Sequence, residues 1–103
     1  MSERTIGILG LGVFGSSVLE GLSKLDMNII AIDNHEERIN QFEPVLTSGV
    51  VGDITDEELL RSAGIDTCDT VVVATGESLE SSVLAVMHCK SLGVPTVIAK
   101  VKS

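Results

Sequence analysis

Apolar and polar residues alternate along the chain in blocks of two different periods. Short apolar runs are typical of buried parallel strands, and the segments between them carry apolar residues at the three- and four-residue spacing of a helix. Each helical segment separates two strand-like runs, which predicts parallel strands joined by helical crossovers. The expected strands cover residues 5–9, 28–33, 45–51, 70–74 and 96–101, and the expected helices cover 15–25, 34–42, 55–64 and 78–92.

Capping signals and apolar stripes define these helices more closely. Asn34 with Glu37, and Thr55 with Glu58, have the spacing of a capping box. In the last and longest helix, we expect the stripe that faces the sheet to consist of Leu79, Val83, Leu84, Val86 and Met87.

The order of the elements predicts a single α/β domain. A length of 103 residues fits one domain. Because crossovers between parallel strands are right-handed, helices should cover both faces of the sheet. We therefore expect a Rossmann-like, doubly wound parallel sheet with strand order 3-2-1-4-5.

Composition narrows the function. Fifteen acidic residues against seven basic ones give a net charge of −8, which argues against a nucleic-acid partner. We expect the two cysteines, Cys68 and Cys89, to be buried, reduced thiols of a cytoplasmic protein. We expect neither a membrane-spanning segment nor a signal peptide.

A glycine-rich motif follows the first expected strand and opens the first expected helix. Gly10, Gly12 and Gly15 form a GxGxxG pattern, with Val13 and Phe14 between the last two glycines. In this context Gly10 allows a tight turn, Gly12 lets a pyrophosphate approach the backbone, and Gly15 lets the helix pack against the strand. The amides of the first helical turn then face the phosphates. The alternative is a plain turn whose glycines serve packing alone.

Asp33 ends the second expected strand, 21 residues after Gly12. An acid at this spacing is expected to bind the hydroxyls of an adenosine ribose. The same carboxylate would repel the 2′-phosphate of NADP, and the next residues, Asn34 and His35, are not the arginine that NADP binding usually needs. Arg38, one helical turn further on, is the one residue that argues the other way. A solvated acid at a strand end is the alternative.

Further candidates lie at the carboxyl ends of the other strands, where open α/β sheets bind their ligands. Asp53 could accept a hydrogen bond from an adenine amino group, or it could serve the turn before the third helix. Gly76 could admit a ligand or form an ordinary turn, and Lys100 could meet a phosphate or be a plain surface lysine.

No catalytic constellation accompanies these residues. Hydride transfer usually needs a His, Lys or Tyr beside the nicotinamide, and the chain has no tyrosine. His35 is expected at the adenosine end of the site, and His88 on one face of the last helix. No metal site is expected.

Four motifs in order resemble one known family. Gly-Leu-Gly-Val-Phe-Gly at 10–15, Ala-Ile-Asp at 31–33, Val-Gly-Asp-Ile-Thr at 51–55 and Val-Val-Ala-Thr-Gly-Glu at 72–77 look like the nucleotide-binding lobe of RCK/KTN domains of the TrkA-N type. These domains belong to cytosolic regulatory subunits of Trk and Ktr potassium-uptake systems. The resemblance extends over nearly the whole chain.

The resemblance implies a function and a set of contacts. RCK/KTN lobes bind NAD(H), ATP or ADP without catalysis, pair into dimers, and build an octameric ring beneath a membrane-embedded potassium-translocating partner, whose ion flow they regulate. Carried over by motif, the contacts with the nucleotide would involve Gly10, Gly12, Val13, Phe14, Gly15, Asp33, Asn34, His35, Asp53, Ile54, Thr75, Gly76, Glu77, Lys100, Val101 and Lys102.

Two departures from the family matter. Members of the Ktr branch often have a phosphate-binding arginine where this chain has Val13, which weakens the expectation of a triphosphate and favours NAD(H). Family members also continue into a sixth strand, a crossover helix and a C-terminal lobe, so the chain is expected to be truncated before these.

Two other functions stay open: the cofactor-binding half of an NAD-dependent oxidoreductase, and a redox sensor for a different partner.

Overall fold

The computed structural model describes residues 4–75 and 78–100. Within these residues the strands are β1 (Thr5–Leu9), β2 (Asn28–Asp33), β3 (Ser48–Val51), β4 (Thr70–Val73) and β5 (Thr96–Ala99). They alternate with the α-helices α1 (Val13–Leu22), α2 (Glu36–Phe42), α3 (Glu57–Ser62) and α4 (Leu79–Ser91). Short 3₁₀ helices cover Glu43–Val45 and Ile65–Thr67.

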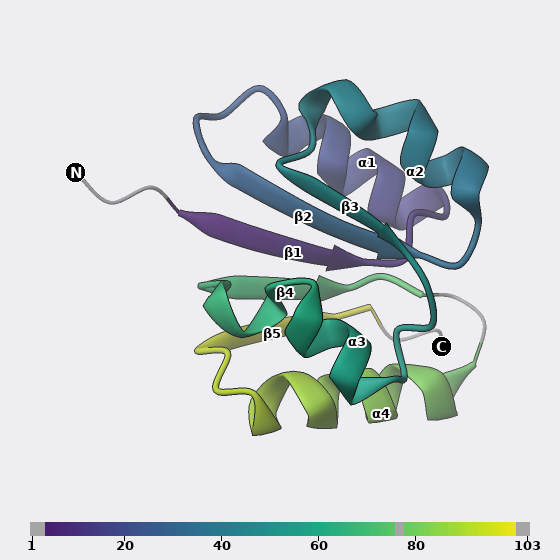
Figure 1. Cartoon of the computed structure of the whole chain (residues 1–103), viewed down its shortest axis with the longest axis vertical. Coiled ribbons are helices and arrows are strands. Elements are labelled where there is room, and N and C mark those ends of the chain that lie inside the picture. Colours follow the sequence, from purple (N-terminus) through teal and green to yellow (C-terminus); the bar gives the residue numbers. More distant parts are fainter. Residues whose placement is uncertain (1–3, 76–77, 101–103) are drawn as a thin grey trace.

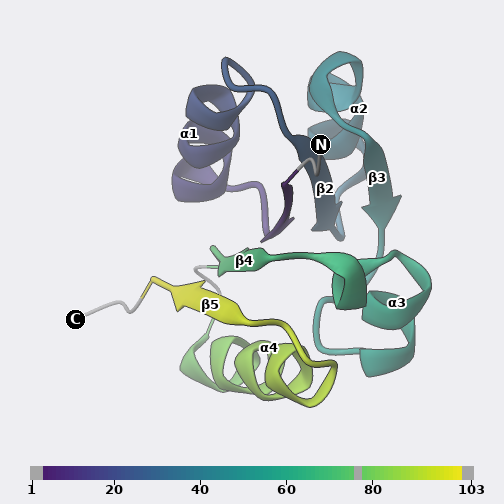
Figure 2. The same cartoon turned by 90° about the vertical axis from the view of Figure 1, so that its left-hand side faces the viewer.

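The strands form one parallel sheet in the order β3-β2-β1-β4-β5, which confirms the predicted fold class. Helices α1 and α2 cover one face of the sheet, and α3 and α4 cover the other (Figures 1 and 2). The chain winds outward from β1 to β3 and then passes back over β1 to β4. The carboxyl ends of β1 and β4 therefore flank the point where the winding reverses, which is where such sheets bind ligands.

The core has two halves because the sheet is buried on both faces. Ile29 and Ala31 of β2 pack with the apolar residues of α1 and α2, whereas Ile30 and Ile32 pack in the half that lies under α3 and α4. This alternation follows from the two-residue period of a strand.

Both cysteines are buried, as expected, and they lie in the half of the core under α3 and α4. Burial away from water raises the pKa of the Cys68 thiol to about 12 and that of Cys89 to about 11. Both side chains are therefore neutral thiols at physiological pH.

The apolar stripe predicted for α4 is wrong. The side chains that α4 buries are Ser82, Ala85 and Cys89. These small residues let the helix approach the sheet closely, and the larger apolar side chains are turned outward. Leu79, Val83, Leu84 and Met87 are exposed, and Val86 alone of the expected stripe packs against the core. No described helix, α4 included, is both long enough and apolar enough to cross a membrane.

Both predicted capping boxes are also wrong. Helix α2 begins after His35, without a side-chain cap. Helix α3 begins after Asp56, whose carboxylate accepts from the amides of Glu58 and Leu59. Asp56 takes the role expected of Thr55 because the hydroxyl of Thr55 donates to Asp53 instead, at 2.7 Å.

Candidate functional site

The glycine-rich turn between β1 and α1 is held by contacts that only glycine permits. Gly10 has a φ of +100°, and a Cβ atom there would lie 3.0 Å from the backbone nitrogen of Thr75. A Cβ atom on Gly15 would collide with the carbonyl oxygen of Gly10. By contrast, a Cβ atom on Gly12 would meet nothing within 4 Å. The fold therefore requires glycine at positions 10 and 15, whereas at position 12 it leaves open space beside the backbone.

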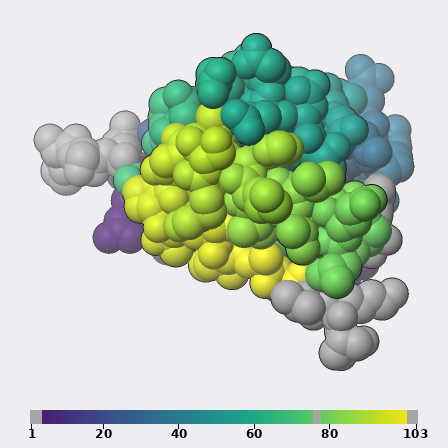
Figure 3. All heavy atoms as spheres, turned by 90° about the horizontal axis from the view of Figure 1, so that it is seen from below, coloured from purple at the N-terminus to yellow at the C-terminus, as the bar shows by residue number. Residues whose placement is uncertain are grey.

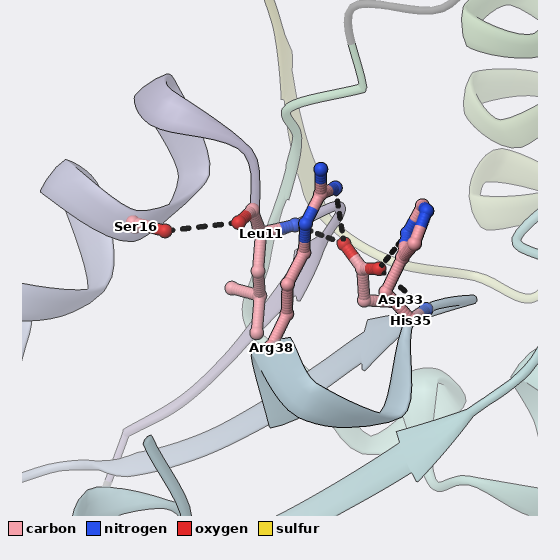
Figure 4. Close-up of polar contacts among 5 residues, drawn as sticks. All are labelled: Leu11, Ser16, Asp33, His35 and Arg38. Atoms are coloured by element: carbon pink, nitrogen blue, oxygen red, sulfur yellow. Dashed lines mark hydrogen bonds and ion pairs between the residues drawn. The ribbon is translucent and has the colours of Figure 1, made fainter. Parts of the chain in front are cut away.

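Asp33 connects this turn to the end of β2 (Figure 4). Its Oδ2 accepts a 2.6 Å hydrogen bond from the amide of Leu11, and its Oδ1 accepts a 2.8 Å hydrogen bond from the amide of His35. The His35 ring lies 3.0 Å from the same Oδ1, and the Arg38 guanidinium lies 3.5 Å from Oδ2. Ser16 fixes the turn from its other side by donating to the carbonyl of Leu11 at 2.9 Å.

The charge of Asp33 is stabilised although the side chain is only 3% exposed. Burial would raise its pKa, but hydrogen bonds from Leu11 and His35, together with the positive charge of Arg38, hold the pKa below its ordinary value. The two amide contacts belong to the backbone. The ring of His35 and the guanidinium of Arg38 are about two-fifths exposed, so they cover the carboxylate on its side toward solvent.

An open recess lies beside Asp33 at the carboxyl edge of the sheet. It is lined by Gly10, Asp33, Asn34, Gly52, Asp53, Ile54 and Thr75. These residues end β2 or follow β1, β2, β3 and β4, so the recess lies across the point where the winding reverses.

Asp53 enters the recess from an ordered turn. The amide and hydroxyl of Thr55 both donate to its Oδ1, at 2.8 and 2.7 Å. These two bonds lower the pKa of Asp53. The carboxylate is thus a charged acceptor whose orientation Thr55 sets.

Most of the predicted site residues within the described chain come together. Six line the recess, and His35 contacts Asp33 beside it. Val13 is 90% exposed at the first position of α1, and the Lys100 ammonium lies 5.2 Å from the centre of the Phe14 ring. The positions outside the described residues are Gly76, Glu77, Val101 and Lys102.

Three contributors were missed from the sequence. Gly52 lines the recess, Leu11 supplies the amide for Asp33, and Ser16 holds the turn. Gly52 precedes Asp53 at a strand end, which is a signal that could have found it. The contribution of Leu11 is a backbone group, so its side-chain identity carries no signal.

The site offers charged acceptors for hydroxyl and amino groups at Asp33 and Asp53. It also offers helix amides and Lys100 for an anion on the side of the glycine-rich turn. Within residues 4–75 and 78–100 no group of three or more metal-ligating side chains occurs. The arrangement suits a ligand with a polar, sugar-like centre and a negatively charged end.

Comparison with known families decides the classification. Residues 6–103 match the model of the TrkA-N domain. The chain belongs to the TrkA-N domain family. This confirms the resemblance to nucleotide-binding lobes of the TrkA-N type.

Curated relatives of this TrkA-N domain are named as potassium-uptake proteins. It is 34% identical over 101 residues to Ktr system potassium uptake protein C of Bacillus subtilis, a match that covers 98% of this chain and 46% of the relative. It is 29% identical over 103 residues to Ktr system potassium uptake protein A of Bacillus subtilis, a match that covers 100% of this chain and 46% of the relative. The chain thus spans less than half the length of these relatives.

Solved structures show the same fold. The NAD(P)-binding domain of an exopolyphosphatase-related protein from Archaeoglobus fulgidus superposes with a TM-score of 0.79 at 24% identity, covering 99% of this chain and 75% of the other. The GsuK channel bound to NAD superposes with a TM-score of 0.78 at 17% identity, covering 99% and 18%. The Kef C-terminal domain of Shewanella denitrificans, in its AMP-bound form, gives 0.76 at 20% identity, covering 93% and 58%.

Proposed function

We propose that this TrkA-N domain is a non-catalytic, adenine-nucleotide-binding domain that regulates a potassium transporter or channel. The observation that carries the proposal is the recess between the glycine-rich turn, Asp33 and Asp53 at the carboxyl edge of the sheet. Family membership and the names of the curated relatives connect that recess to potassium uptake.

The proposed ligand is NAD(H), ATP or ADP rather than NADP. In this pose Asp33 accepts from the ribose hydroxyls, Asp53 lies toward the adenine, and the phosphates face Gly12 and the first turn of α1. A 2′-phosphate would place a second negative charge against the buried, ionised Asp33. Proteins that share the fold have been solved with NAD and with AMP, which supports an adenine nucleotide.

Regulation would follow from unequal affinity. A nucleotide changes the arrangement of the domain and its partners only if it binds one arrangement more tightly than another. The proposed partners are further copies of the chain, as a dimer building toward an octameric ring, and a membrane-embedded potassium-translocating subunit. The domain would then lie at the cytoplasmic face of the membrane, held there by that subunit.

The outer face of α4 supports self-association. Its exposed Leu79, Val83 and Met87 recur at four-residue spacing, and Leu84 lies next to Val83. Figure 3 shows the underside of the molecule, where α4 spreads between α3 and β5. Exposed apolar side chains that gather on one face of a helix are typical of interaction surfaces.

A thermal-shift titration against NAD, NADH, ATP, ADP and NADP tests the ligand. A nucleotide at ~100 times its dissociation constant adds about 2.7 kcal/mol of stability, which is roughly 10–20 °C for a domain of this size. We expect such a shift with at least one of the first four and none with NADP. The absence of a shift with every nucleotide would overturn the proposal. Detectable hydride transfer by the protein would favour an oxidoreductase instead.

A further inference from the structure

His88 links α4 to the segment that leads into α3, although 33 residues separate it from Thr55. Its Nε2 lies 2.9 Å from the carbonyl oxygen of Thr55. Its Nδ1 lies 3.1 Å from Oε1 of Glu57. The ring is 23% exposed, so it is held between the two helices, which lie side by side in Figure 1.

Both partners of the ring are hydrogen-bond acceptors. A carbonyl oxygen and an ionised carboxylate can only accept, and a neutral imidazole has a single N–H to donate. Only the imidazolium form donates to Thr55 and Glu57 together. The position of His88 in the last turn of α4 also favours a positive charge, because the helix dipole is negative at that end.

The other charged groups around the ring are few. Arg61 of α3 shares Glu57, with its Nη2 3.6 Å from Oε2, and Asp56 and Asp53 lie in the connecting segment, where they accept from backbone amides. On α4 itself the residues one turn away from His88 are uncharged: Leu84, Ala85, Ser91 and Leu92. The strands beneath α4, Thr70–Val73 and Thr96–Ala99, carry no titratable side chain.

The segment that His88 holds also orients Asp53. Thr55 accepts from His88 through its carbonyl and donates to Asp53 through its amide and hydroxyl. Asp53 and its neighbour Ile54 line the recess. Thr55 is therefore the single residue that connects His88 to Asp53, and a lost contact at His88 is expected to alter the orientation of Asp53 in the recess.

We propose that His88 is a positioning residue whose protonated ring holds the Asp53–Thr55 turn in place and makes nucleotide affinity depend on pH. The affinity part of this inference rests on the proposed function, whereas the control of the turn does not. Deprotonation removes one of the two N–H donors of the ring, so the turn becomes less ordered. Asp53 is then no longer held in one orientation beside the recess. Nucleotide affinity then falls as the pH rises.

The first experiment follows the backbone amide signals of residues 53–57 by NMR without nucleotide, from about pH 5 to about pH 8. In the wild-type chain these signals are expected to move together with the ring signals of His88. In His88→Gln that movement is lost, and in Lys90→Gln, an exposed control on the same helix, it is retained. Amide signals that titrate identically in His88→Gln would overturn the inference, whether or not any nucleotide binds.

The second experiment measures the dissociation constant of NAD and of ADP by calorimetry over the same pH range. The readout is the difference between each variant and the wild type in how the dissociation constant changes with pH. We expect affinity to fall about threefold to tenfold more in the wild type than in His88→Gln. In Glu57→Gln, which keeps the histidine, the side-chain amide can donate to the neutral ring as well as accept from the protonated one, so we expect a smaller fall than in the wild type. Equal pH profiles in all variants would contradict the proposed effect on affinity, whereas a wild type that binds neither nucleotide would contradict the proposed function.

Discussion

The backbone amide of Leu11 donates a 2.6 Å hydrogen bond to the carboxylate of Asp33. This bond joins the glycine-rich turn after β1 to the end of β2, 22 positions away along the chain. It gives Asp33 a structural duty in addition to the proposed contact with a ribose. The residue that would select the ligand therefore also sets the shape of the turn that would bind its phosphates.

Replacing Asp33 with Asn tests this double role. The amide side chain keeps one acceptor oxygen, but its NH₂ group would face the donors that now meet the second oxygen. We expect the free energy of unfolding to fall by about 1–3 kcal/mol in urea denaturation, and nucleotide affinity to fall as well. Asp26→Asn, at an exposed position, is the matched control. A variant Asp33→Asn as stable as this control would show that the second carboxylate oxygen and the negative charge of Asp33 add no stability.

The stability of the domain should also respond to acid through Asp33. The pKa of this carboxyl in the folded chain lies below its ordinary value of 3.8. As the pH falls below that value, the unfolded chain takes up the proton first, so the free energy of unfolding decreases. The contribution is fully present above pH 3.8 and is lost as the pH falls through the lower, folded-state value.

Denaturation curves from about pH 6 to about pH 2 measure this effect. As the pH falls, the difference in the free energy of unfolding between the wild type and Asp33→Asn should become smaller. Asp33 is the only carboxyl group that differs between the two proteins, so this change reports its protonation. If the difference in the free energy of unfolding stayed constant down to the lowest pH, the lowered pKa of Asp33 would not be a source of stability.

Gly12 and Gly15 should separate binding from folding. A methyl group at position 15 collides with the carbonyl of Gly10, so Gly15→Ala is expected to cost about 1–3 kcal/mol of stability. A methyl group at position 12 meets open space, so Gly12→Ala should change stability by less than about 1 kcal/mol. Its methyl group would stand where the phosphates are proposed to approach, and affinity should fall about tenfold or more. Unchanged nucleotide affinity in Gly12→Ala would place the phosphates elsewhere.

Lys100 is expected to contribute to anion binding from β5's side of the turn. Its ammonium lies over the Phe14 ring, next to the first turn of α1. Because the side chain is exposed, Lys100→Gln should weaken ADP binding only about twofold to fivefold, and the effect should disappear at high salt. Lys24→Gln, an exposed lysine beyond the end of α1, should leave the dissociation constant unchanged. A loss that persists at 1 M salt would point to a direct, desolvated contact instead.

The sequence by itself determined the order of the strands, the glycine-rich turn and the position of Asp33. These depend on local signals: the two periods of apolar residues, the turn chemistry of Gly10, and the fixed spacing between the turn and the end of the second strand. The handedness of crossovers then converts a linear order of elements into one sheet topology. For this reason the fold and most of the recess could be predicted without coordinates.

Only the tertiary structure decided which face of α4 meets the sheet, which side chains cap α2 and α3, and what His88 contacts. An apolar stripe indicates a buried face only when large side chains fit the space. Here Ala85 and Cys89 allow a closer approach than Val83 and Met87 would. Likewise Thr55 does not cap α3, because its hydroxyl donates to Asp53 instead. His88 contacts the carbonyl oxygen of Thr55, which lies 33 positions away along the chain. Such choices depend on competition between contacts distant in the chain, which no local pattern records.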